Sequence, residues 1–160
     1  MCCYNCTTGK KTKDNILDIS IGQTAILTPV LAMLLLAFVV WIVLFITRFK
    51  AIGELKIKPD AINTPDAVDS LLPNYARYPG HNFKNLFEVP VLFYIMCFYL
   101  YATGTADSVA INCAWAFVGL RVLHSIVQCS YNNVNHRFAA YLFSCIALWV
   151  MVMRSAIDLF

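Results

Sequence analysis

Three polar side chains lie on one face of an otherwise apolar predicted helix, and their types suit the binding of a charged ligand. His81, Asn85 and Glu88 are spaced i, i+4 and i+7, which places them on one helical face. Ionisable groups inside a membrane-spanning segment are costly, so they are functional candidates by default. Pro90 removes a helical hydrogen bond, which predicts either a packing kink or an opened wall of a site.

A second polar cluster lies on the next predicted helix. Arg121, His124 and Gln128 are spaced i, i+3 and i+7 and also share a face, and Arg137 stands at the start of the following apolar stretch. The two clusters together hold more cations and donors than one carboxylate can satisfy. A half-buried cleft of net positive character favours an anionic ligand.

Glu88 and Arg121 are expected to form an ion pair, because each lies well inside its helix. An alternative interpretation gives the cluster a purely structural role. In that case the pair, with Asn85 bridging two helices, holds the bundle together and binds nothing.

The composition indicates what kind of protein positions these groups. Of the 160 residues, 60% are hydrophobic and 13% are charged, against about 25% charged residues in a typical soluble domain. This composition excludes a disordered chain and argues against a water-soluble globule. The net charge of +3 comes without a basic stripe carrying aromatic residues, so no nucleic-acid partner is expected.

The distribution of charge predicts an all-α integral membrane four-helix bundle. Ile19 to Thr47 carries no Asp, Glu, Lys or Arg, and about 20 apolar residues cross a bilayer. A cleaved signal peptide is the alternative, but the apolar run is too long and ends in Arg48-Phe49-Lys50. The expected division is a polar tail over 1–18 and a membrane domain over 19–160, with spans at about 22–48, 82–104, 107–129 and 136–157.

A polar loop is expected over about 49–79. Within it, Asn63-Thr64-Pro65-Asp66 predicts a helix start with Thr64 as N-cap. The loop and the last turn share one side of the membrane and the two termini share the other. The loop side carries seven Lys and Arg residues and the side of the termini carries four. Because basic residues favour the cytoplasmic side, the loop is expected in the cytoplasm. The seven are Arg48, Lys50, Lys56, Lys58, Arg77, Lys84 and Arg137, and the four are Lys10, Lys11, Lys13 and Arg154.

Three of the seven cysteines, Cys2, Cys3 and Cys6, cluster before the first span. No second cysteine pair or histidine accompanies them, so no metal site is expected there. Palmitoylation of Cys2 or Cys3 and a plain unstructured tail remain alternatives. The cysteines inside the spans are interpreted as small buried hydrophobes.

Both polar clusters resemble motifs of one family, the membrane-associated proteins in eicosanoid and glutathione metabolism. Asn85-Leu86-Phe87-Glu88, with Pro90 close behind, resembles its second-helix motif. Gly119-Leu120-Arg121-Val122-Leu123-His124-Ser125-Ile126 resembles the third-helix motif of microsomal glutathione transferase and microsomal prostaglandin E synthase. Arg137 follows Arg121 by 16 residues, where those enzymes carry a further arginine.

The resemblance implies a homotrimer that binds glutathione between neighbouring subunits near the cytoplasmic face. Its activity would be that of a membrane-bound transferase or peroxidase acting on lipophilic electrophiles or lipid hydroperoxides. Arg137 would stabilise the glutathione thiolate as the catalytic residue. The residues implied in binding glutathione are Asn85, Glu88, Arg121, His124, His81, Gln128 and Arg48.

Three positions depart from the family's pattern. His81 and Gln128 stand where the eicosanoid enzymes carry arginine and tyrosine, and Phe138 stands where the prostaglandin synthase carries serine. These differences argue against prostaglandin or leukotriene synthesis. The alternative function is therefore a catalytically silent member of the fold that serves as a structural or accessory membrane subunit. A small channel or transporter is a third reading, disfavoured because no half-helix repeat is visible.

Overall fold

The computed structural model describes residues 23–159, and its regular structure there is helical. The N-terminal cysteines lie outside the described residues, so no structural statement concerns them. The elements are α2 (Leu27–Leu55), the 3-10 helix η1 (Pro59–Ile62), α3 (Pro65–Leu71), α4 (Asn74–Asn85), α5 (Val89–Thr103), α6 (Ser108–Cys129) and α7 (Val134–Leu159).

The first predicted span forms α2, which continues further than the sequence indicates. The helix runs to Leu55 instead of ending near residue 48. Thr47 does not interrupt it, because its hydroxyl donates back to the carbonyl of Val43 at 2.8 Å. The predicted polar loop therefore contains the last part of α2. Lys56 then ends the helix in the left-handed conformation, with φ 50°.

The polar segment after α2 contains two short helices, η1 and α3. α3 begins where the sequence predicts, with Thr64 as its N-cap and Pro65 in its first turn. The Ala67 N–H donates to the Thr64 hydroxyl at 3.2 Å and so satisfies one free donor of the first turn. Leu72 and Ala76 pack with Ala51 in a small apolar cluster that ties this segment to α2.

α4 and α5 together make the second long apolar stretch, but they are separate helices. α4 ends at Asn85, α5 begins at Val89, and Pro90 occupies the first turn of α5. Glu88 has φ −98° and ψ −100°, which is not a helical conformation. Proline lacks the N–H that a continuous helix would need at this point. The interruption at Pro90 predicted from the sequence is therefore present.

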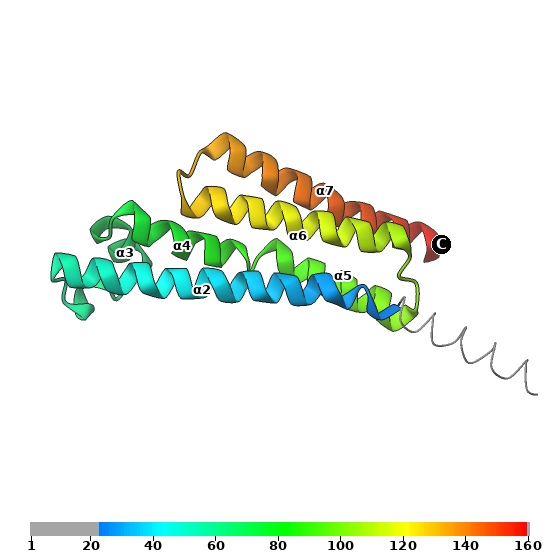
Figure 1. Cartoon of the computed structure of the whole chain (residues 1–160), viewed down its shortest axis with the longest axis horizontal. Helices are drawn as coiled ribbons and strands as arrows, with labels where there is room; N and C mark the ends of the chain where they lie inside the picture. The colour runs from blue at the N-terminus through cyan, green and yellow to red at the C-terminus, as the bar shows by residue number, and fades with distance from the viewer. Residues whose placement is uncertain (1–22, 160) are drawn as a thin grey trace, which may run out of the picture.

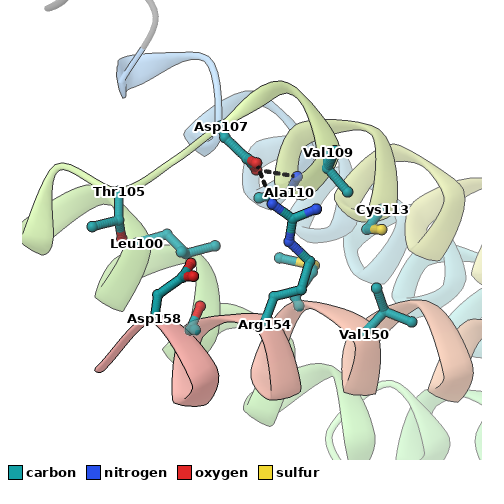
Figure 2. A pocket seen from close by; sticks show the side chains of 11 residues that line it. Leu100, Thr105, Asp107, Val109, Ala110, Cys113, Val150, Arg154 and Asp158 are labelled. Carbon is teal, nitrogen blue, oxygen red and sulfur yellow. Dashed lines mark hydrogen bonds and ion pairs between the residues drawn. The ribbon is translucent and has the colours of Figure 1, made fainter. Parts of the chain in front are cut away.

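An acidic cap and an arginine join α6 to α7 at the end of the bundle near the chain's C-terminus. Asp107 accepts from the Ala110 N–H at 2.7 Å through Oδ1, and from Arg154 Nη2 at 2.7 Å through Oδ2 (Figure 2). The cavity beside this pair is about 90 Å³, which is well below the few hundred Å³ of a small-molecule site. We assign the pair a structural role, fastening the start of α6 to the last turns of α7.

The helices form an elongated bundle with α6 and α7 on one side and α2 beside α4 and α5 on the other (Figure 1). α3 and the α6–α7 turn lie at one end, and the start of α2 and the chain's C-terminus lie at the other, as expected. Phe93 of α5 and Phe117 of α6 stack in the core with ring centroids 4.3 Å apart. Leu31, Leu35 and many similar side chains are exposed on the outside, as a lipid-facing surface requires. The four candidate spans are α2, α4 with α5, α6, and α7.

Candidate functional site

A polar network joins α4 to α6 inside the bundle. Asn85 Nδ2 donates to Gln128 Oε1 at 3.0 Å, and His124 Nε2 lies 2.8 Å from the same oxygen. A second hydrogen bond joins the same two helices, because the Ser125 hydroxyl donates to the side-chain oxygen of the fully buried Asn82 at 3.2 Å. Asn85 and Gln128, one from each predicted helical face, are therefore in contact.

The network continues from α6 into α7. His124 Nδ1 lies 3.0 Å from the carbonyl oxygen of Arg137, so both ring nitrogens of His124 face acceptors. Arg137 Nη1 donates to Asn132 Oδ1 at 2.9 Å, which orients the guanidinium and leaves its other N–H groups available. Asn132, in the α6–α7 turn, has φ 48°, and asparagine is one of the few residues that tolerate this conformation. Asn132 was not among the residues predicted from the sequence, although the Asn132-Asn133 pair between two spans is a turn signal.

These groups line an open cleft of about 450 Å³ among α4, α6 and α7. This volume lies within the range of about 300–1,000 Å³ that is typical of small-molecule sites. Six of the eight residues predicted to bind or act lie on its wall: His81, Asn85, Glu88, His124, Gln128 and Arg137. Glu88 reaches the cleft because it stands in the break between α4 and α5. The break thus opens a wall of the cleft.

Tyr141 and Phe138 also line the cleft. Tyr141 follows Arg137 by one helical turn on the same face of α7, so helical spacing could have identified it. Phe138 is 60% exposed, and it brings an aromatic surface to the rim.

Arg121 does not reach the cleft, and the expected ion pair between Arg121 and Glu88 is absent. The Arg121 side chain is fully buried, and none of its three guanidinium nitrogens has a hydrogen-bond partner in the described part of the chain. Its guanidinium lies over the rings of Phe117 and Tyr141, with centroids 5.2 and 4.9 Å away. Glu88 is exposed and attracts Arg121 only at a distance. His124 and Gln128 share a helical face with Arg121 and reach the cleft, whereas Arg121, earlier in α6, packs against the ring of Tyr141.

Arg48 lies on a different cleft, between the end of α2, α3 and α4. His81 lines both clefts, and its Nε2 is 2.8 Å from Asp69 Oδ1 in the polar segment. Arg48 is therefore not brought together with Arg137 within the chain. Among residues 23–159 no group of three or more His, Cys, Asp or Glu side chains is arranged to hold a metal ion.

Comparison with protein-family models identifies the family of the chain. The model of the MAPEG family, the membrane-associated proteins introduced above, matches residues 26–157, which is most of the chain. The chain belongs to the MAPEG family. Comparison with curated proteins and with solved structures gives no match. Membership in MAPEG and the four apolar spans establish an integral membrane protein that crosses the bilayer several times, of the glutathione and eicosanoid metabolism type.

Proposed function

We propose that this MAPEG protein is a membrane-bound, glutathione-dependent transferase or peroxidase that acts on lipophilic electrophiles or lipid hydroperoxides. The observation that carries the proposal is the cleft that gathers six predicted residues from α4, α6, α7 and the break between α4 and α5. Glutathione has two carboxylates, an ammonium group and a thiol. The cleft offers Arg137 and His81 for the anionic groups, Glu88 for the ammonium, and the amide of Asn85 as a further polar contact.

Arg137 is the candidate for stabilising the thiolate. A nearby guanidinium favours the charged form of a thiol and so lowers the pKa of the glutathione thiol. Asn132 holds one edge of the guanidinium, so the group is oriented before the ligand binds. The thiolate would then attack an electrophilic carbon to give a thioether, either displacing an anionic leaving group or adding to an activated double bond that then takes up a proton. With a hydroperoxide, two glutathione molecules would give the alcohol, water and glutathione disulfide.

The cleft is open toward the outside of α4 and α7, where the exposed Val134 and Phe138 form part of its wall. A lipophilic substrate would enter from the bilayer at this rim. The family's homotrimer is part of the proposal, because a neighbouring subunit would close the open side. In that assembly Arg48 of a neighbouring copy would be the added cation, since Arg48 lies on another cleft of its own chain.

The test is the ultraviolet thiolate absorbance of glutathione bound to the purified protein, titrated against pH. We expect a thiolate signal at neutral pH that Arg137→Leu abolishes, with kcat/KM at least about a hundredfold lower. Arg154→Gln is the matched control, because it removes an arginine at the far end of the same helix. Unchanged turnover in Arg137→Leu would remove Arg137 from the mechanism.

The same titration distinguishes the proposed activity from the alternative function. Glutathione binding without a thiolate, or no binding at all, would favour a catalytically silent structural or accessory subunit. Three replacements favour this alternative: His81 and Gln128 stand where the family's eicosanoid enzymes carry arginine and tyrosine, and Phe138 stands where the prostaglandin synthase carries serine.

A further inference from the structure

His81 is contacted by an acidic residue that lies outside the cleft proposed to bind glutathione. Its Nε2 lies 2.8 Å from Asp69 Oδ1 of α3. His81 lines the proposed glutathione cleft together with Glu88 and Arg137, whereas Asp69 lines only the cleft that holds Arg48. The Asp69 carboxylate therefore holds the imidazole ring from outside the glutathione cleft and connects α3 to that site.

The protein also fixes the backbone of Asp69. Its carbonyl group has no partner within α3, because the residue four positions further on is Pro73, which has no N–H. Arg77 Nη1 of α4 donates to this carbonyl oxygen instead. The preceding residue, Val68, packs against the small apolar cluster that ties this segment to α2. These contacts keep the Asp69 carboxylate beside His81.

The contact decides which ring nitrogen of His81 remains available to a ligand. An ionised carboxylate only accepts hydrogen bonds, so Nε2 carries a proton when it faces Asp69. Nδ1 has no hydrogen-bond partner among the described residues. In the neutral ring Nδ1 is then an acceptor, and it becomes a donor only when the ring takes up a second proton.

This tautomer changes how the position can bind an anion. An arginine here would donate to a carboxylate of glutathione at any physiological pH, because a guanidinium stays charged. The neutral ring of His81 would instead present a lone pair to that carboxylate. Binding of a ligand carboxylate at Nδ1 therefore requires the ring to take up a proton.

We propose that Asp69 is a positioning residue of the glutathione site, and that it couples the binding of a ligand carboxylate at His81 to the uptake of one proton. The inference rests on the proposed function and adds regulation by pH to it. The affinity for glutathione rises as the pH falls through the range in which imidazoles titrate. Asp69 acts through His81 and does not touch the ligand.

Other charged and titratable groups surround His81 on the walls of the two clefts. They are Arg48 of α2, Arg77 and Lys84 of α4, Glu88 of the break, His124 of α6, and Arg137 and Tyr141 of α7. His124 differs from His81, because both of its ring nitrogens already lie within 3.0 Å of protein oxygens. A pH effect that arises from these groups would persist when Asp69 alone is changed.

The test measures binding of S-methylglutathione, which has no thiol to titrate, to the purified full-length protein in detergent. Isothermal titration calorimetry at about pH 5.5 and about pH 7.5 covers most of the imidazole range. We expect the Kd to be roughly tenfold lower at the acidic pH, as one charge-assisted hydrogen bond would give. Titrations at about pH 7.5 in buffers of different ionisation enthalpy should also show proton uptake on binding.

Asp69→Asn is the decisive variant, because it keeps the shape of the side chain. Its amide N–H can donate to Nε2 of His81, which permits the tautomer that carries the proton on Nδ1. We expect this variant to bind equally well at both pH values and to take up no proton. His81→Gln, whose amide donates without titrating, should also lose the pH dependence.

Asp66→Asn is the matched control. It removes an exposed carboxylate from the same helix, and Asp66 lines neither cleft. Its binding should keep the pH dependence and the proton uptake of the wild type. Thermal unfolding of each variant checks that the fold is retained.

The outcomes distinguish this inference from the proposed function. If Asp69→Asn lowered affinity by the same factor at both pH values and kept the proton uptake, Asp69 would have only a structural role. Wild-type binding that does not depend on pH, or loss of the dependence in Asp66→Asn, would also overturn the inference while leaving the proposed function intact. No binding of S-methylglutathione by the wild type at either pH would contradict the proposed function itself.

Discussion

At the scale of single residues, Arg121 is the group whose environment differs most from expectation. Its buried guanidinium has no hydrogen-bond partner among the residues described and rests on two aromatic rings. A buried donor without an acceptor costs about 1–3 kcal/mol, whereas a cation over a ring contributes about 0.5–2 kcal/mol. Because all three guanidinium nitrogens of Arg121 lack a partner and the group is charged, the cost exceeds the gain, so Arg121 does not stabilise the fold.

Replacing Arg121 with Met should therefore leave the thermal unfolding temperature unchanged or raise it. Glutathione affinity should fall, because Tyr141 loses the cation that packs on its ring beside the cleft. Thermal unfolding and glutathione titration on the same preparations would check both effects.

Arg121→Lys is the matched control for this experiment. It keeps the charge but loses the planar group that stacks on the rings, so it should be less stable than Arg121→Met. A larger loss of stability in Arg121→Met than in Arg121→Lys would show that the fold needs the charge, as the expected pair with Glu88 would have required.

At the scale of elements, the α6–α7 turn positions Arg137. Asn132 adopts φ 48° and accepts from the Arg137 guanidinium, and Asn133 Oδ1 accepts from the first N–H groups of α7, those of Asn135 and His136. One short turn thus ends a helix, begins the next and orients the candidate catalytic side chain.

A pair of substitutions at Asn132 separates these roles. Asn132→Gly keeps the left-handed backbone and loses only the contact with Arg137, so it should lower kcat/KM with little change in stability. Asn132→Ala loses the contact and also strains the turn, which should lower the free energy of unfolding by about 1 kcal/mol more. Chemical denaturation and steady-state kinetics would measure both.

Equal stability of the two Asn132 variants would contradict the assignment of backbone strain at this turn. Wild-type kinetics in Asn132→Gly would contradict the role of Asn132 in orienting Arg137.

The sequence predicted the helices correctly where a single property of the sequence, such as a long uncharged run or a capping signal, determines the structure. Long uncharged runs predicted the four spans, and the Thr64 and Pro65 signals predicted the start of α3. Spacing also grouped His81, Asn85 and Glu88, which do line one cleft, although Glu88 stands in the break after α4 and not on the same helix. It could not predict the Arg121 environment, because spacing fixes direction around one helix and says nothing about the rotation of a neighbour. The end of α2 was missed because its last two turns are helical although they carry the charged residues Arg48, Lys50 and Glu54.

At the scale of the whole molecule, the arrangement of helix ends defines two opposite faces. α3 and the α6–α7 turn share one end, and the start of α2 and the chain's C-terminus share the other (Figure 1). The excess of Lys and Arg at the α3 end predicts that this end faces the cytoplasm.

Single cysteines introduced into a variant that lacks the native ones would check this orientation. Lys58→Cys and Asn135→Cys should react with a membrane-impermeant thiol reagent in inverted vesicles, where the cytoplasmic side faces out. Thr105→Cys should be protected there and should react in vesicles of the native orientation. The opposite pattern would reverse the orientation, and reaction of Lys58→Cys and Thr105→Cys from the same side would contradict the bundle.

The break between α4 and α5 has a consequence for hydration. Backbone that leaves helical geometry at membrane depth is tolerated only where protein buries it or where it borders water. Glu88 stands in this break, is exposed and lines the larger cleft. Under the proposed function, water would follow the cleft inward to Glu88, beside lipid-facing helix surfaces. A polar thiol compound could then meet an oil-soluble molecule at a water–lipid boundary inside the protein, with neither having to leave its own phase.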